Sequence, residues 1–387
     1  MQHIKLNILN SDKLNLIKRV IVVIVLSLGL IQQALSQDSP QPFITSWSAT
    51  AGESISIGLN ANLNYDFDYT WRNASGQIVD SGTHTSADGE FTTAFSASET
   101  HTLEITGAFP HLINAYPVDL LLDVVQWGDI IWESMNSTFA SWPGASFSAT
   151  DAPNLSQVTD ISLIFSRADN FNQDLNTWNV SNVTNMSRAF LRAESFNGNI
   201  SDWETGNVTD MSFMFAAASN FNGDVSGWDV GNVTNMNRLF NIANDFNADL
   251  SRWNVQNVTD MFRMFRQSAF DQNIGSWDVG NVDDMGEMFS SGSLSSTNYD
   301  SLLIGWSALA NLQDGVNFNA GNTEACAGQA EVGRLRLINN FGWNINDAGI
   351  CDDAANLLSF EIDGEQMEET TIDFSNHTVD LTVAFST

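Results

Sequence analysis

Hydrophobic residues recur at fixed intervals through the middle of the chain. Tryptophans follow one another by 24 or 25 residues, a methionine lies eight residues after each, and a phenylalanine lies four residues after each methionine. The tryptophans are Trp178, Trp203, Trp228, Trp253 and Trp277. The methionine and phenylalanine pairs are Met186 and Phe190, Met211 and Phe215, Met236 and Phe240, Met261 and Phe265, and Met285 and Phe289. Such constancy predicts a tandem repeat in which every unit presents the same side chains to its neighbours.

The pattern within each unit predicts one short helix and one short strand. Met186, Phe190 and Ala193 have the i, i+4, i+7 spacing of a helix face. In "QDLNTWNV", Leu175 and Trp178 fit the apolar positions of a short strand. One strand and one helix in about 25 residues matches the leucine-rich-repeat period, and a single unit cannot bury its apolar face alone. The predicted fold class is an α/β solenoid, leucine-rich-repeat-like, with the methionines and phenylalanines pointing inward.

The regions that flank the repeat have other patterns. Alternating runs such as "ESISIGL" and "HTLEITG" predict a small all-β sandwich before it. The first residues carry basic groups, an apolar run at 20–30 and small residues before Gln37, which is the order of a cleavable secretory signal. The predicted domains are a signal peptide at 1–36, the sandwich at 37–126, about seven turns of solenoid at 127–292, a C-terminal cap at 293–353, and the start of a further β module or a truncated tail at 354–387. The protein is therefore expected to be secreted or displayed on the cell surface.

The chain is strongly acidic, since 46 acidic and 14 basic residues give a formal net charge of −32. Beyond residue 36, every basic residue is an arginine. A surface of this sign repels phosphate backbones and anionic lipid, which argues against nucleic acid as a partner and against membrane insertion of the mature chain. Two interpretations of the acidity remain open: it keeps an exported protein soluble, or it attracts a basic or cation-bridged partner.

The two cysteines, Cys326 and Cys351, are predicted to form a disulfide. In an exported chain an isolated pair is typical of a covalent cross-link rather than of a metal or catalytic site. The bond would close a loop of about 25 residues, for which chain entropy corresponds to about 3 kcal/mol. We expect it to secure the chain after the last repeat unit.

Polar and aromatic columns of the repeat have two interpretations each. Asp174, Asp224 and Asp249 occupy equivalent places in their units and form a candidate ligand column, because calcium prefers such oxygen donors. No Asp-x-Asp-x-Asp-Gly loop accompanies them, so we expect no metal and keep Ca²⁺ as the alternative. The recurring tryptophans and asparagines are expected to form internal ladders, with a glycan-binding surface as the alternative.

No catalytic pattern is present. The repeat contains no histidine, and the chain has no HExxH, GxSxG or phosphate-loop motif. With no lysine beyond residue 36 and the cysteines paired, the usual covalent nucleophiles reduce to serine and threonine. We therefore predict a protein that is not an enzyme, with no catalytic residues and no cofactor.

The repeated segment "NVTNMSRAF…SFNGNISDW" resembles the BspA-like leucine-rich repeat of bacterial surface proteins, a unit of about 25 residues known from a mycoplasma domain of unknown function. The flanking segments "VVQWGDIIWESMNSTF" and "NYDSLLIGWSAL" are similar to the caps of that family. "PFITSW" and "HTLEITGAFP" resemble a PKD-like module, although "TWRNASG" stands where that module usually has a WGDG turn.

The resemblance implies secreted or cell-surface proteins, some of which are adhesins. The predicted function is an exported bacterial surface protein that acts as an adhesion or binding scaffold through the repeat. Its expected partner is a protein or glycan on host matrix or neighbouring cells. The alternatives are a glycan-binding module that uses the Trp and Asp/Asn columns, and a structural stalk with no ligand of its own.

Overall fold

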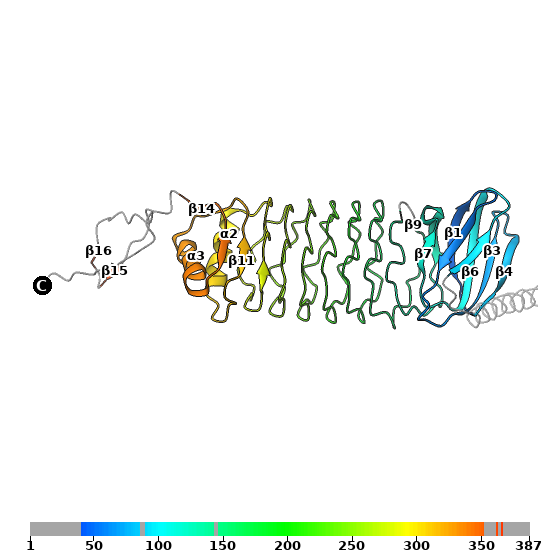
Figure 1. The fold of residues 1–387 in the computed structure, drawn as a ribbon, viewed down its shortest axis with the longest axis horizontal. Coiled ribbons are helices and arrows are strands. Elements are labelled where there is room, and N and C mark those ends of the chain that lie inside the picture. Colours follow the sequence, from blue (N-terminus) through cyan, green and yellow to red (C-terminus); the bar gives the residue numbers. More distant parts are fainter. Residues whose placement is uncertain (1–39, 86–89, 143–145, 352–360, 363–364, 367–387) are drawn as a thin grey trace, which may run out of the picture.

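The computed structural model describes residues 40–85, 90–142, 146–351, 361–362 and 365–366. They form an elongated molecule with β-sheets at the N-terminal end, stacked turns in the middle and two helices at the C-terminal end (Figure 1). The elements of the N-terminal end are β1 (Phe43–Ala49), β2 (Ser54–Gly58), β3 (Asp66–Arg72), β4 (Ile78–His84), β5 (Glu90–Ala94), β6 (Glu99–Ala108), β7 (Ile113–Tyr116), η1 (Val118–Leu120), β8 (Leu121–Gln126) and β9 (Ser146–Phe147). Those that follow are β10 (Asp284–Met285), α2 (Ser296–Ser307), β11 (Asn317–Asn319), β12 (Glu324–Ala325), α3 (Gly328–Phe341), β13 (Asn344–Asn346), β14 (Gly349–Ile350), β15 (Glu361–Ile362) and β16 (Glu365–Gln366).

Two predicted segments fall largely beyond this description. The predicted signal peptide at 1–36 lies outside the described residues. Of the predicted module or tail at 354–387, only the two-residue strands β15 and β16 are described, and they pair antiparallel.

The N-terminal end consists of two β-sheets. The larger has the strand order β4-β3-β6-β1-β8-β9 and is antiparallel except for the β8–β9 pair, and the smaller is antiparallel with the order β5-β2-β7. Alternate residues of β1 are buried, as expected for a strand with one face against a core. Aromatic rings join the sheets: Trp71 of β3 meets Phe95 edge to face at 5.0 Å, and Phe67 meets Phe91 at 5.8 Å.

The predicted α/β solenoid, with one strand and one helix per turn, is wrong. In the described part of the chain the α-helices are α2 and α3, and both follow the repeat. The predicted helix at 186–193 is a series of turns, and the predicted strand around Leu175 and Trp178 is an irregular segment interrupted by a turn. Successive units meet through single parallel bridges rather than extended ladders. The bridging residues are Asp160, Asn185, Asp210, Asn235, Asp260 and Asp284.

Left-handed backbone positions take the place of the helix. In the segment 186–193, the N–H of Ala189 closes a turn on the carbonyl of Met186 at 3.1 Å. The neighbouring residue Arg188 has a φ of 59°, and its N–H instead donates to the carbonyl of Ser212 in the next unit at 2.9 Å. Arg192, four residues further on, repeats this conformation with a φ of 60°. Alternate N–H groups therefore close turns within a unit and link it to the next.

The same two left-handed positions recur in every unit, and none of them is glycine. The first column is Ser137, Leu163, Arg188, Phe213, Arg238, Arg263 and Glu287, and the second is Ser141, Arg167, Arg192, Ala217, Ile242, Gln267 and Ser291. A left-handed L-residue costs about 1–2 kcal/mol. The N–H groups from Ser137 through Gln267 each donate to the next unit at 2.6–3.1 Å, which offsets part of this cost.

Two columns of phenylalanine rings fill the core of the repeat. All ten of the predicted core methionines and phenylalanines, from Met186 to Phe289, have at most 1% of their surface exposed. In the first column Phe215 stacks on Phe240 at 5.6 Å, and in the second Phe221 stacks on Phe246 at 5.9 Å. The rings of one unit, such as Phe215 and Phe221, stack at 3.9 Å. Each unit thus depends on both neighbours to seal its rings.

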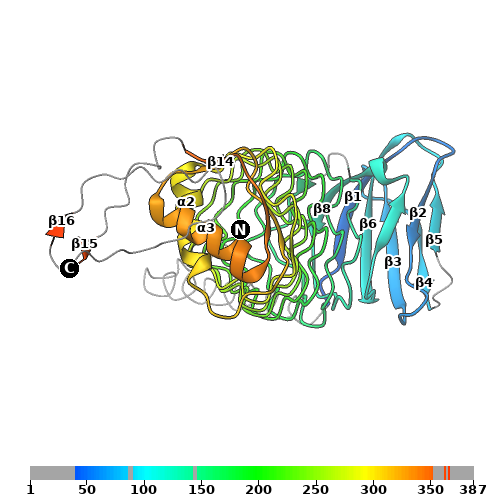
Figure 2. The ribbon, with the colours of Figure 1, turned by 60° about the vertical axis from the view of Figure 1, so that its left-hand side comes forward.

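Two helices lie across the C-terminal end of the stack (Figure 2). Helix α2 touches the backbone of the last unit directly, because a Cβ on Gly305 would lie 1.9 Å from the carbonyl oxygen of Gly275. Parallel pairing continues from β10 to β11 and β13. The carboxylate of Asp347, just after β13, accepts two hydrogen bonds from Arg334 of α3 at 2.7 and 2.8 Å and one from Tyr299 of α2 at 2.5 Å. This buried network holds both helices to β13.

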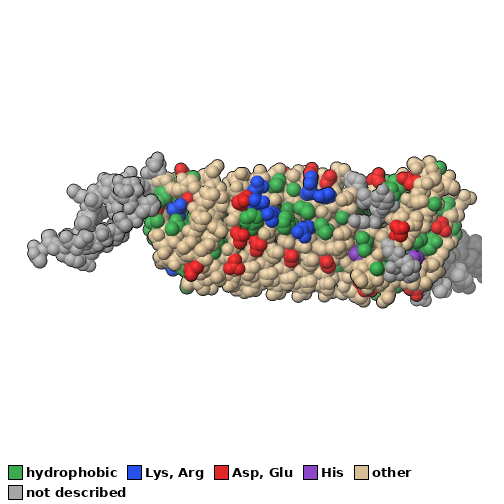
Figure 3. Space-filling model, viewed as in Figure 1, with side chains coloured by type: hydrophobic (Ala, Val, Ile, Leu, Met, Phe, Trp, Pro, Cys, Tyr) green, Lys and Arg blue, Asp and Glu red, His purple; other side chains and the backbone are tan. Residues whose placement is uncertain are grey.

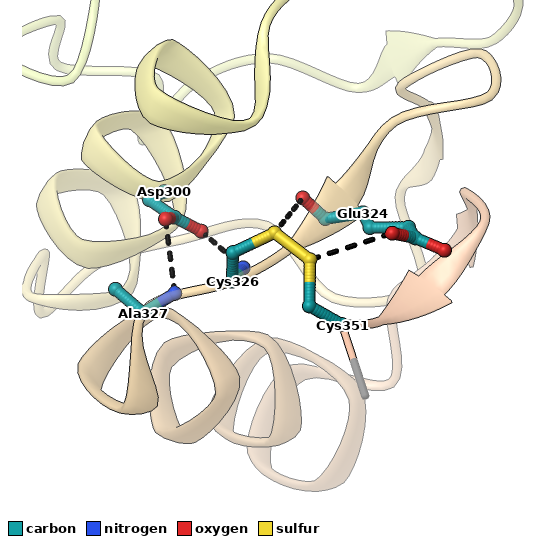
Figure 4. The surroundings of a disulfide bond; sticks show 5 residues. All are labelled: Asp300, Glu324, Cys326, Ala327 and Cys351. Carbon is teal, nitrogen blue, oxygen red and sulfur yellow. Dashed lines mark hydrogen bonds between the residues drawn. A yellow bond between two sulfur atoms is a disulfide. The ribbon is translucent and has the colours of Figure 1, made fainter. Parts of the chain in front are cut away.

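The disulfide between Cys326 and Cys351 is present in the structure. Both cysteines directly follow the paired strands β12 and β14, so the bond reinforces that pair. The carboxylate of Asp300 in α2 accepts the N–H groups of Cys326 and Ala327 at 2.8 and 2.9 Å (Figure 4). These N–H groups lie just before α3, so the carboxylate stands near the positive N-terminal end of that helix, whose N-cap Ala327 has no side-chain cap.

Candidate functional site

The tryptophan column is internal. All five recurring tryptophans are buried, with 1–5% of their surface exposed. The indole N–H of Trp203 donates to the carbonyl of Leu175 in the preceding unit at 2.9 Å, and Trp228 donates to Ile200 in the same way at 3.1 Å. These rings therefore offer no exposed platform on which a sugar could stack.

The asparagine column also links units. The side-chain amide of Asn207 donates to the carbonyl of Ser181 at 2.7 Å, and that of Asn232 donates to the carbonyl of Gly206 at 2.7 Å. The equivalent amides are those of Asn182, Asn257 and Asn281. They satisfy backbone carbonyls at the bends, which gives the recurring asparagine a structural role in each of these units.

The predicted ligand column of Asp174, Asp224 and Asp249 shapes turns. Each carboxylate accepts the N–H of the residue two positions later, at 2.9–3.0 Å. Hydrogen bonds from Ser226 lower the pKa of Asp224, and those from Ser251 lower the pKa of Asp249. The three side chains are exposed and lie in separate units, one or more apart.

One group of potential metal ligands is close together among the described residues. It consists of Glu324 and the two cysteines, with ligand atoms within 4.8 Å of one another. The two sulfurs are bonded to each other and cannot act as thiolate ligands. This cluster therefore does not fit a metal centre.

The most distinctive exposed feature is a cationic face on the repeat. Six of the ten arginines beyond residue 36 lie at, or next to, the left-handed positions. We call this surface the arginine strip and define it as Arg167, Arg188, Arg192, Phe213, Arg238, Phe262, Arg263 and Arg266. Figure 3 shows arginines gathered with hydrophobic side chains on one long side of the stack, bordered by acidic side chains. This local concentration of positive charge is not apparent from the net negative charge of the chain.

Arginine and phenylalanine alternate along the strip. The guanidinium carbons of Arg188 and Arg238 both lie 4.9 Å from the ring centre of Phe213. The guanidinium carbons of Arg238 and Arg263 lie 4.8 and 4.7 Å from the ring centre of Phe262. Cation–π contacts of this kind contribute about 0.5–1 kcal/mol each at exposed sites. They hold long side chains in register across three unit boundaries.

The backbone explains why these side chains project. Arg188 is exposed, whereas its neighbours Ser187 and Ala189 are buried. Phe213 is likewise half-buried between buried neighbours. The left-handed conformation directs one residue out of each turn, and whichever side chain the sequence places there reaches the surface.

One end of the strip is neutralised and the rest is not. Glu287 accepts two hydrogen bonds from Arg263, at 2.7 and 3.0 Å, and lies 3.3 Å from Arg266. The ion pairs of the described residues include none with Arg167, Arg188, Arg192 or Arg238. Burial, and then the nearby Arg263 guanidinium, lower the pKa of Arg238, and the opposing effect of the Asp260 and Glu287 carboxylates is too small to reverse this.

Comparison with known proteins bears on the repeat alone. The family model described as a Mycoplasma protein of unknown function, DUF285, matches residues 133–241 and again residues 198–306. The resemblance to this repeat family is thereby confirmed over these residues, whereas the leucine-rich-repeat and PKD-like details gain no support from it. No curated protein and no solved structure matches the chain. Among the described helices, none combines the length and apolar character needed to cross a membrane.

Proposed function

We propose that this chain is an exported bacterial surface protein that acts as an adhesion or binding scaffold through the arginine strip of its stacked repeat. One observation carries the proposal: cationic and aromatic side chains stand in register on one exposed face, over consecutive units of an otherwise acidic molecule. Interior packing does not require arginine at these positions, because serine, alanine and glutamine occupy equivalent places in other units. Selection for an exposed contact surface accounts for their concentration on this face.

Two further features support export and display. The predicted signal at 1–36 and a disulfide both suit an oxidising exterior. The elongated shape separates the strip from both ends of the molecule (Figure 1). The N-terminal pair of sheets would then serve as the PKD-like spacer that the sequence resembles, and repetition along the stack would let several weak contacts act together.

The experiment is retention of beads that carry the mature chain, from residue 37 onward, on cell layers and on coats of matrix proteins under flow. We expect beads with the wild-type chain to be retained more strongly than bare beads. A variant with Arg188→Gln, Arg192→Gln and Arg238→Gln should lose most of this retention, while Arg252→Gln, which removes an exposed arginine near Asp249 and outside the arginine strip, should not.

The stalk alternative makes the opposite forecast. If the chain only carries another domain, wild-type beads and bare beads will be retained equally, and the scaffold proposal fails. Glycan binding through the tryptophan column is not favoured, because those rings are buried and their N–H groups are used between units.

A further inference from the structure

Resting on the proposed function, we infer that the arginine strip binds a linear anionic polysaccharide, whose carboxylate or sulfate groups are held by Arg188, Arg192 and Arg238. The inference concerns the chemistry of the ligand, which neither the repeat pattern nor the family match specifies. It follows from how the guanidinium groups are presented, which of their charges are free, and what shape of partner the surface accepts.

The guanidinium groups are oriented before any ligand arrives. Phe213 lies between Arg188 and Arg238, with both guanidinium carbons 4.9 Å from its centre. Contact through the flat face of a guanidinium leaves its N–H edge for a ligand. In Arg238, Nη1 donates to Oδ1 of Asn237 at 2.8 Å, which leaves the other N–H groups of that guanidinium for a ligand. That edge matches a carboxylate or sulfate in a two-point contact, and less flexibility is lost because the stem is already held.

The strip is a surface of donors. A guanidinium offers five N–H donors and no acceptor. Phe213 and Phe262 are each already in contact with two guanidinium groups, which leaves little of either ring for stacking by a base or a sugar. A ligand rich in acceptor oxygens therefore suits the strip better than an extended peptide, whose own N–H groups would find no partner there.

The free charges lie in a row. Glu287 neutralises the end of the strip at Arg263 and Arg266, while Arg167, Arg188, Arg192 and Arg238 have no carboxylate within 4.0 Å among the described residues. Arg167 and Arg192 hold the same position in adjacent units, and Arg188 and Arg238 are two units apart. A polymer with anionic groups at regular intervals can engage several of them at once.

The surface around the arginine strip favours a narrow ligand. Acidic side chains border the strip (Figure 3), so a broad acidic protein surface would meet repulsion on its flanks. Two cavities of about 700 and 360 Å³ lie at the two ends of the repeat, and no arginine of the strip lines either one. Protein partners usually anchor a large side chain in a pocket. A narrow polymer can instead lie along the strip.

The test measures binding of the full mature chain to four immobilised probes: polygalacturonate, dextran sulfate, neutral dextran and polyglutamate. We expect binding to one or both anionic polysaccharides and none to dextran. The polygalacturonate and dextran sulfate arms distinguish a carboxylate from a sulfate ligand. The Arg188→Gln, Arg192→Gln, Arg238→Gln variant should lower the affinity about tenfold or more, since hydrogen bonds to charged groups are strong.

Two controls separate recognition from general charge attraction. Arg252→Gln removes one positive charge beside Asp249 and should leave the affinity unchanged. Replacing the same three strip arginines by lysine keeps the charge and removes the planar fork, and should still weaken binding several-fold. Unchanged thermal midpoints would show that all variants remain folded.

Several results would overturn the inference. They are equal binding of the glutamine variant and the wild type, an equal loss in Arg252→Gln, full binding by the lysine variant, and tighter binding to polyglutamate than to either polysaccharide. Bead retention decides the scaffold proposal separately. If the beads are retained but no polysaccharide binds, the scaffold proposal holds and the polysaccharide inference is wrong. If the beads are not retained and no polysaccharide binds, both proposals are wrong.

Discussion

Left-handed residues set the geometry of the repeat at the residue scale. Type II and related turns normally take glycine or asparagine where φ is positive. Here arginine, phenylalanine and isoleucine occupy such positions, and isoleucine is β-branched, which makes Ile242 at 61° an outlier. The hydrogen bond from each such N–H to the next unit stabilises the conformation. A residue other than glycine at these positions places a side chain, such as that of arginine, on the surface of the repeat.

A glycine substitution should reveal this strain. Ala217 has a φ of 57°, and we expect Ala217→Gly to raise the free energy of unfolding by about 0.5–1 kcal/mol, because relief of left-handed strain exceeds the added flexibility of the unfolded chain. The adjacent Ala216 is buried and outside the left-handed set, so Ala216→Gly should lower stability by about 1 kcal/mol. Urea unfolding measures both. Equal destabilisation by the two substitutions would contradict this account of the turns.

At the scale of elements, the sequence specified the repeat period and the buried positions but not the backbone conformation. Met186 and Phe190 are four residues apart, which suits a helix face. The left-handed residues Arg188 and Arg192 are also four residues apart, so the turns repeat with nearly the period of a helix. A helix and this series of turns therefore give the same pattern of apolar residues. Glycine and asparagine are absent from the left-handed positions of these turns because hydrogen bonds to the next unit stabilise the residues there. Those hydrogen bonds cannot be read from the sequence of a single unit.

The arginine strip escaped sequence analysis for a related reason. Tryptophan, methionine and asparagine each recur as one residue type at one position of successive units, which makes their columns visible in the sequence. The strip's column changes identity from Leu163 to Arg188, Phe213 and Arg238, so no recurring letter marks it. The signal that the sequence does carry is arginine and phenylalanine in successive units at one position.

The elements of the C-terminal end should depend on one carboxylate. Asp347 is buried, pairs with Arg334 through two hydrogen bonds and accepts the hydroxyl of Tyr299. We expect Asp347→Asn to destabilise this end by about 3–5 kcal/mol, because it leaves a half-buried guanidinium unpaired. Asp314→Asn, at an exposed carboxylate of the same end, should change stability by less than about 0.5 kcal/mol. Hydrogen exchange in α2 and α3 would show the difference, and slow exchange in both variants would refute it.

For the molecule as a whole, the two sheets and the repeat share one hydrophobic core. Phe43 of β1 packs on Trp127 and Trp132, with ring centres 5.7 and 5.1 Å apart. His111 lies buried at this junction, where its Nε2–H donates to the carbonyl of Asn136 at 2.8 Å. The N-terminal end and the stack should therefore unfold as coupled parts rather than as independent domains.

This junction should weaken in mild acid. Burial lowers the pKa of His111 below its usual 6.5, so the folded chain resists a proton that the unfolded chain accepts. The contribution of neutral, buried His111 to the free energy of unfolding is fully present above about pH 6.5, and it falls as the pH drops towards the lower pKa of the folded state. Urea unfolding of the wild type and His111→Gln at about pH 8 and pH 5 isolates it, because the variant lacks this slope. A stability gap between the two proteins that stays constant with pH would show that His111 does not control the junction.

The direction of the bonds between units has a mechanical consequence. They join each unit to the next along the long axis, so tension between the two ends would load them one row at a time instead of shearing many rows together. A unit of 25 residues that opened in this way would release about 80 Å of extended chain. Under tension, such a molecule would lengthen in steps and absorb work, while the units that stay closed would keep their arginines aligned.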